Sequence, residues 1–219
     1  MERKFDEELN NLKEKMMQMA TLAEESITMA VRSLKERNED FAQQVFRGEE
    51  TLNLLDIEID NLGMQLFALR QPMASDLRLI TATMRIAVEL ERIGDLSVNI
   101  AQRSLELMKQ PPLKPLIDIP RMAELAQHMV KDAIDAFVNK DAKLAQNVCE
   151  RDDKVDDLND QIFRELLTYM MQDPKTIEKA VELILVGRHI ERIADHATNI
   201  CEDVVYLVKG KTIKHHFEQ

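Results

Sequence analysis

Apolar residues recur at steps of three and four positions along most of the chain. In the first 40 residues this spacing is carried by Leu9, Leu12, Met16, Met19, Ala20, Ala23, Ile27, Ala30, Val31 and Leu34. Because an α-helix turns once every 3.6 residues, such residues line one side of a helix and can be buried together. The pattern predicts an amphipathic helix over residues 3–37.

Capping residues and prolines divide the rest of the pattern. Asn38 can cap a second helix that Pro72 ends, Ser75 can cap a third, and Asp173 can cap the last. The stretch KQPPLKPLIDIP, residues 109–120, contains four of the six prolines and cannot be helical throughout. We therefore predict six helices, over residues 3–37, 39–70, 75–108, 120–139, 141–171 and 174–209.

The two halves of the chain repeat one another. The segment ERIGDLSVNI at residues 91–100 matches ERIADHATNI at residues 191–200, and Pro72 matches Pro174 at nearly the same offset. Self-similarity at a fixed spacing indicates a duplicated structural unit. The predicted fold class is all-α, with two tandem three-helix bundles at residues 1–108 and 120–219, joined by a proline-rich linker at residues 109–119.

Composition excludes several classes of protein. Five Gly, six Pro and 4% aromatic residues disfavour a β-sandwich or barrel. The net charge of −11, from 40 acidic and 29 basic residues, disfavours nucleic-acid binding. No uncharged run approaches the roughly 20 residues of a membrane span, so we expect a cytoplasmic protein. Cys149 and Cys201 are isolated in the sequence and predict neither a disulfide framework nor a zinc knuckle.

Pairs of carboxylates four residues apart occupy equivalent places in the two halves. Residues four apart share a helix face, so Glu91 stands beside Asp95, and Glu191 beside Asp195. The same faces carry small residues, namely Ala87, Gly94, Gly187 and Ala194. Small side chains beside acids are expected to leave room for a bound group.

The preceding helix of each half carries a second polar row. These rows are Glu49, Asn53, Asp56 and Asp60 in the first half, and Asp152, Asp156 and Asn159 in the second. Acid rows that face each other repel strongly unless cations neutralise them. Oxygen donors without thiols suit iron, manganese, magnesium or calcium, and Asn99 and Asn199 could add carbonyl ligands.

The acids also admit a structural interpretation, in which they face solvent or pair with Arg85, Arg92 and Arg192. Their recurrence in both halves favours metal binding. His189 and His196 flank the second motif, and we interpret them as surface or core histidines rather than ligands. The Glu-x-x-His pairs of di-iron bundles are absent from the sequence, as are phosphate-loop and hydrolase motifs.

Taken together, several segments resemble the PhoU family. They are the duplicated ERI(G/A)D motif with its downstream Asn, the acid rows, RQP at residues 70–72, FRELLTYM at 163–170 and VVYLVKGKTIKH at 204–215. The resemblance covers essentially the whole chain. It implies two bundles related by a pseudo-twofold axis, a homodimer, and a bacterial adaptor between the ATPase of a phosphate ABC transporter and a membrane sensor histidine kinase. Such an adaptor holds the phosphate-starvation response off when phosphate is plentiful.

The resemblance also implies a metal motif, E(D)xxxD. It carries over as Glu91 with Asp95, Glu191 with Asp195, and Asp152 with Asp156, whereas Glu49 is followed by Asn53 in place of the second acid. Iron or zinc clusters are the implied cofactors. With the two asparagines above, the expected ligands are Glu49, Asn53, Glu91, Asp95, Asn99, Asp152, Asp156, Glu191, Asp195 and Asn199.

Two other functions compete with a non-enzymatic adaptor. A carboxylate-bridged metalloenzyme of helical-bundle type is the main alternative, since a metal with an open coordination position can activate water. Metal storage is the third. Turnover by the isolated protein would separate the enzyme from the adaptor.

Overall fold

The computed structural model describes residues 2–210, and that part of the chain contains no β-strand. Its elements are α1 (Glu2–Glu36), α2 (Glu39–Arg70), α3 (Ala74–Met108), α4 (Asp118–Asn139), α5 (Ala142–Cys149), α6 (Asp152–Gln172), the 3-10 turn η1 (Pro174–Thr176) and α7 (Ile177–Lys209). The predicted all-α class is confirmed. The end of the VVYLVKGKTIKH segment, after Gly210, lies outside the described residues.

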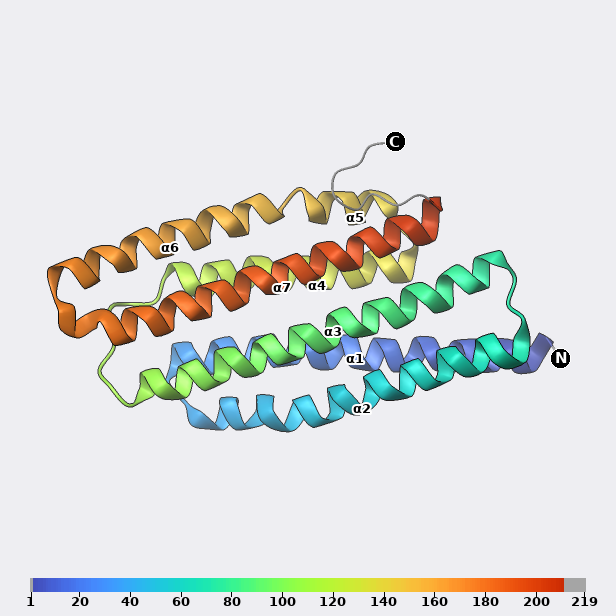
Figure 1. The fold of residues 1–219 in the computed structure, drawn as a ribbon, viewed down its shortest axis with the longest axis horizontal. Coiled ribbons are helices and arrows are strands. Elements are labelled where there is room, and N and C mark those ends of the chain that lie inside the picture. Colours follow the sequence, from blue (N-terminus) through green and yellow to red (C-terminus); the bar gives the residue numbers. More distant parts are fainter. Residues whose placement is uncertain (1, 211–219) are drawn as a thin grey trace.

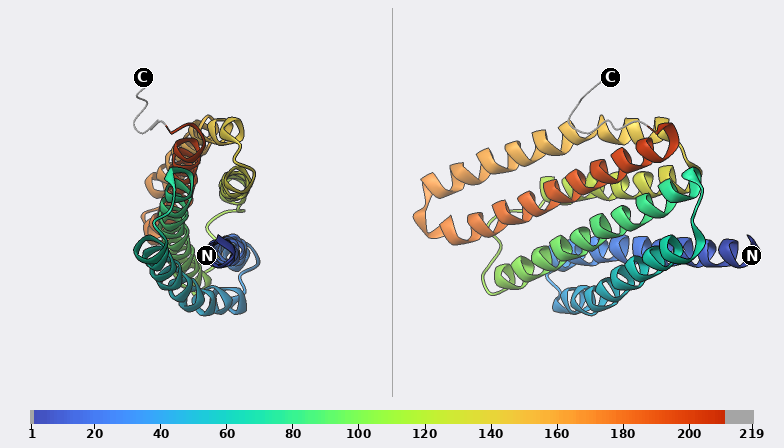
Figure 2. Two further views of the ribbon diagram at one scale, coloured as in Figure 1. Left: turned by 90° about the vertical axis from the view of Figure 1, so that its right-hand side faces the viewer. Right: turned by 45° about the vertical axis from the view of Figure 1, so that its right-hand side comes forward.

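The helices lie in two layers. Figure 1 shows α3 and α7 side by side along the middle of the molecule. In the end-on view of Figure 2, α2, α3, α7 and the α5–α6 segment follow one another in a curved layer, and α1 and α4 cover one side of it. Helices α1 to α3 pack on one another, while α7 packs on α4, α5 and α6. The two three-helix bundles expected from the repeat are therefore present.

One continuous apolar core extends through both bundles. In α1 the periodic positions predicted from the sequence are buried except for Val31, which is partly buried, and Leu12, Met16 and Ile27 have no exposed surface. A helix of 35 residues is about 50 Å long, so this stripe runs most of the length of the molecule. Truncating one such side chain to Ala typically costs about 2–5 kcal/mol.

The single helix predicted for residues 141–171 is wrong, because the chain forms two helices there, α5 and α6. Between them the amides of Arg151 and Lys154 donate to the carbonyls of Val148 and Arg151, three residues back, at 3.0 and 3.1 Å. These bonds tighten the backbone and interrupt the α-helical register. Since neither Pro nor Gly marks the break, the pattern carried no sign of it.

The helix ends agree with the sequence in some places and differ in others. Asn38 and Asp173 cap their elements by accepting backbone N–H bonds, as expected. Ser75 does not cap α3, because extended backbone at Met73 already starts that helix at Ala74 without a side-chain cap. Helix α4 begins at Asp118, before Pro120, since proline is tolerated in a first helical turn.

Helices α3 and α7 run antiparallel along the boundary between the bundles, and polar pairs cross it at three levels. Arg85 of α3 donates to Asp203 at 3.2 Å, and Arg103 donates to Glu182 at 3.2 Å. Between these pairs, Glu89 contacts residues of α7 that are considered below. We call these cross-links the α3–α7 ladder. Together with the shared core, the ladder fixes one bundle against the other.

Candidate metal centres

In the first bundle, the acid row of α2 faces the ExxxD pair of α3. The pKa of Glu91 is raised, first by burial and then by the negative charges of Asp95, Asp56 and Glu49. Nε of Arg92 lies 3.4 Å from Glu91 and its Nη1 lies 3.5 Å from Asp95. One arginine therefore offsets part of the charge, as the structural interpretation of these acids anticipated.

In the second bundle, the acids of α6 and α7 also repel one another. Asp152 is the first residue of α6, and its pKa is raised to about 6, chiefly by burial. The charges of Asp156, Asp195 and Glu191 raise it further. One carboxylate oxygen of Asp152, Oδ1, is buried and finds no hydrogen-bond partner within residues 2–210. The cluster therefore holds excess negative charge and an unsatisfied oxygen.

Asn159 connects the two rows of the second bundle. Its amide donates to Oε2 of Glu191 at 2.5 Å. A Cβ atom on Gly187 would lie 2.8 Å from Oδ1 of Asn159, so the glycine makes room for this asparagine. In the first bundle a Cβ on Gly94 would lie 2.9 Å from the side chain of Leu52. The expectation that these two glycines leave room for a bound group is therefore wrong, since protein side chains fill both spaces.

The remaining predicted ligands have different surroundings. Asn53, Asp156 and Asp195 are exposed, whereas Glu49 and Asn99 are half-buried. The amide of Asn199 donates to Glu89 of α3 at 3.1 Å, and so takes part in the α3–α7 ladder.

The two histidines beside the second motif are partly buried. Nδ1 of His196 lies within hydrogen-bond distance of Oε2 of Glu89, at 2.6 Å, and thereby joins the α3–α7 ladder. The pKa of His189 is lowered by burial and by the charges of Arg103 and Arg192. The sequence analysis did not identify Glu89 as part of this contact. In the alignment of the repeats at an offset of 100, Glu89 is the residue equivalent to His189.

Chemistry and geometry give different answers about metal binding. The donors are oxygen atoms, they repel one another, and one of them is unsatisfied, which fits a hard or borderline cation. Yet among the described residues no three His, Cys, Asp or Glu side chains converge closely enough to hold an ion. The rows thus supply suitable donors, while their side chains remain spread along the helices.

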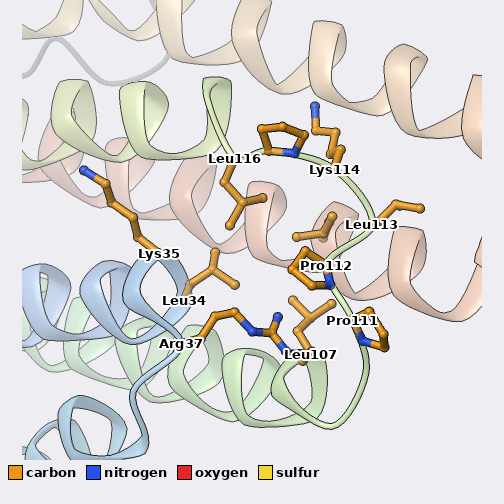
Figure 3. Close-up of a pocket in the computed structure, with 11 residues that line it drawn as sticks. Leu34, Lys35, Arg37, Leu107, Pro111, Pro112, Leu113, Lys114 and Leu116 are labelled. Atoms are coloured by element: carbon orange, nitrogen blue, oxygen red, sulfur yellow. Dashed lines mark hydrogen bonds between the residues drawn. The ribbon is translucent and has the colours of Figure 1, made fainter.

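An apolar cavity of about 230 Å³ lies elsewhere, where the linker crosses between the bundles. Figure 3 shows Leu34, Leu107, Pro112 and Leu116 gathered around it. Beside it, Nη2 of Arg37 donates to three carbonyl oxygens at the end of α3, those of Leu107, Met108 and Gln110. Lys114 on the rim pairs with Glu165. The cavity therefore contains none of the predicted site residues.

Both bundles match a known family model. The model of the PhoU domain matches residues 16–104 and again residues 119–204, one match for each half. The chain belongs to the PhoU family. The resemblance drawn from the ERI(G/A)D repeat and its acid rows is thereby confirmed. No helix within residues 2–210 combines the length and apolar composition needed to cross a bilayer.

Named relatives of this PhoU-family chain cover nearly its whole length. It is 42% identical over 97% of its length to the phosphate-specific transport system accessory protein PhoU homolog of Aquifex aeolicus, covering 96% of that protein. It is 40% identical to the Caulobacter vibrioides homolog, with 95% and 91% of the two chains covered. Both pairs therefore align over nearly the whole length of each chain.

Solved structures agree with the fold. The crystal structure of PhoU from Pseudomonas aeruginosa matches with a TM-score of 0.91 at 37% identity, over 94% of this chain and all of that one. The phosphate transport system regulatory protein PhoU from Streptococcus pneumoniae matches with a TM-score of 0.88 at 27% identity, over 96% and 99% of the two chains. The arrangement of both bundles is thus shared with these proteins.

Proposed function

We propose that this protein is a non-enzymatic, cytoplasmic accessory protein that regulates phosphate uptake. The observation that carries the proposal is the match of both halves to the PhoU domain, together with full-length relatives named as accessory proteins of phosphate-specific transport. The fold supports an adaptor, because long helices present wide surfaces. None of the hydrolase or nucleotide-binding motifs sought in the sequence accompanies them.

More finely, we propose a homodimeric negative regulator that docks onto the ATPase of a phosphate ABC transporter and onto a membrane sensor histidine kinase. An adaptor shifts the state of a partner only if it binds one conformation more tightly, by about 1.4 kcal/mol for each tenfold shift. Exposed apolar side chains support docking, since they lose unfavourable hydration on contact. On α2, Leu54 is 62% exposed and Ile57 is 57% exposed.

We also propose that the acid rows bind metal ions, with iron or zinc as the first candidates. In the first bundle the ligands would be Glu49, Asn53, Glu91, Asp95 and Asn99, and in the second Asp152, Asp156, Glu191, Asp195 and Asn199. A bound cation supplies positive charge that offsets the repulsion between facing carboxylates. The residues themselves position the oxygens: α6 presents Asp152 and Asp156 toward the pair on α7, and Asn159 orients Glu191.

A deletion strain tests the regulatory function. If the protein represses the starvation response, its loss turns on phosphate-starvation genes in phosphate-rich medium. Complementation with Leu54→Ser and Ile57→Ser together should fail, while circular dichroism and metal content stay normal. A matched control is Val138→Ser on α4, an apolar residue 52% exposed away from α2, and it should complement fully. An unchanged response in the deletion strain would refute the proposal.

The metalloenzyme alternative is tested on the purified, metal-loaded protein. Phosphate esters and simple esters should not be turned over above the rate of the free metal ion. Turnover that disappears in Glu91→Gln or Glu191→Gln would favour the enzyme over the adaptor, because these changes remove a charged donor while keeping the size of the side chain.

A further inference from the structure

The fold brings the two cysteines together. Cys149 is the last residue of α5, and Cys201 lies on α7, against which α5 packs. Their side chains lie next to each other. Cys201 has no exposed surface, whereas Cys149 is partly accessible to solvent. Although the two cysteines are far apart in the sequence, they are neighbours in the fold.

The two thiols differ in a way that gives each a distinct part in oxidation. Cys149 is partly accessible, so a small oxidant in solution can reach it, whereas Cys201 is enclosed by the core. An accessible thiol beside a second, protected thiol is the usual arrangement of a redox-sensitive pair.

We propose that Cys149 and Cys201 form a reversible intramolecular dithiol–disulfide pair that is oxidised by hydroperoxides. The proposal goes beyond the regulatory function and depends on neither the metal nor the partners. It rests on the contact between the two thiols, on the accessibility of Cys149 and on the packing of α5 against α7.

The reaction balances in two steps. The Cys149 thiolate attacks one peroxide oxygen: an S–O bond forms, the O–O bond breaks, and the leaving oxygen takes a proton from solvent to give water or an alcohol. The Cys201 sulfur then attacks the Cys149 sulfur: the S–S bond forms, the S–O bond breaks, and the departing hydroxide takes the Cys201 proton as water. Two thiols lose two electrons in total, which the peroxide gains. An external dithiol reverses the change.

The position of the bond gives it a structural effect. Cys149 lies just before the break between α5 and α6, and α6 begins at Asp152. A disulfide to Cys201 ties this break to α7. The junction that carries the first acid of α6 is then held in place by a covalent bond as well as by packing.

Peptide mapping of the full-length protein tests the pair. After treatment with hydrogen peroxide, we expect two thiols to disappear per chain, a peptide joining Cys149 to Cys201 under non-reducing conditions, and recovery of both thiols with dithiothreitol. The proposal is overturned if both cysteines are still alkylated after excess peroxide, or if the only disulfides join different chains.

Two single variants test the order of the steps. In Cys201→Ser, Cys149 should accumulate as sulfenic acid that dimedone traps. In Cys149→Ser, oxidation of the buried Cys201 should be about tenfold slower or more, since its thiol is inaccessible to the oxidant. Equal oxidation rates of Cys201 with and without Cys149 would contradict the assignment. Circular dichroism checks folding, and the wild-type peptide map remains decisive if a variant does not fold.

Discussion

Nδ1 of His196 on α7 lies 2.6 Å from Oε2 of Glu89 on α3, so these two residues join the bundles across their boundary. The histidine side chain is 15% exposed and the glutamate 22% exposed. Asn199 donates to the same carboxylate oxygen. The contact breaks the symmetry of the repeat, because at an offset of 100 Glu89 corresponds to His189 and His196 to Leu96.

Glu89→Ala should lower the free energy of unfolding by about 2 kcal/mol. The substitution leaves donors on His196 and Asn199 without their acceptor in a mostly buried place, and such donors are costly. Urea unfolding followed by circular dichroism measures the change. The matched control is Glu50→Ala on the exposed surface of α2, which should change stability by less than about 0.5 kcal/mol. Equal losses in the two variants would contradict a structural role for Glu89.

The pKa of Asp152 predicts how the metal-free protein responds to pH. Because this pKa rises from 3.8 to about 6 on folding, the folded state binds more protons than the unfolded state between those values. The contribution of Asp152 to stability is therefore largest at low pH and is lost as the pH rises through about 6. We expect Asp152→Asn to flatten this part of the profile and to stabilise the chelated protein at pH 7 by about 1 kcal/mol, after allowing for solvent screening.

Urea unfolding from pH 4.5 to 7.5 in the presence of chelator gives this measurement. The difference between variant and wild type isolates Asp152 from the other acids. Parallel profiles would show that its carboxyl titrates alike in the folded and unfolded states.

Metal binding by the acid rows predicts a loss confined to one bundle. Glu191→Ala with Asp195→Ala should remove the metal of the second bundle and leave that of the first. The matched variant, Glu91→Ala with Asp95→Ala, should do the reverse. Elemental analysis after purification without chelator measures the metal content. A rise in the melting temperature on adding metal gives an independent readout, because metal at a hundredfold excess over Kd stabilises the folded state by about 2.7 kcal/mol. Unchanged metal content in both variants would rule out these ligands.

Division of the chain in the linker tests how far each bundle is independent. Fragments 1–110 and 111–219 should each retain helical circular dichroism, because most contacts of each helix lie within its own bundle. They should also bind one another, since the α3–α7 ladder and a shared core cover the boundary. Arg85→Ala with Arg103→Ala should weaken the complex about tenfold or more. Fragments that are unfolded when separate would indicate a single folding unit.

Features that depend on neighbouring residues in the sequence were predictable. The spacing of Leu12, Met16 and Ile27 reports a helix face directly, and the 100° advance per residue placed Glu91 and Asp95 together before any fold was known. The repeat then located the same face in the second half. Local periodicity carries this information because a helix is defined by contacts three and four residues apart.

Features that depend on the packing of distant helices were not predictable. The Glu89–His196 pair and the thiol contact of Cys149 with Cys201 arise only once α5 and α3 lie against α7. The role of Gly187 also needed the fold, because the side chain that fills its space, Asn159, comes from another helix. Spacing along one helix shows where small residues lie and gives no information about which side chain occupies the space beside them.

The single core beneath α3 and α7 has a mechanical consequence. Two bundles joined only by a proline-rich linker would be free to change their relative orientation. Bundles with a shared core instead form one rigid body. Helix α2 lies along one edge of the curved helix layer and α6 along the other (Figure 2). With helices spaced about 9 Å apart, the two edges stand roughly 25–30 Å from each other. Two proteins bound to opposite edges of the layer would therefore be kept at that fixed separation.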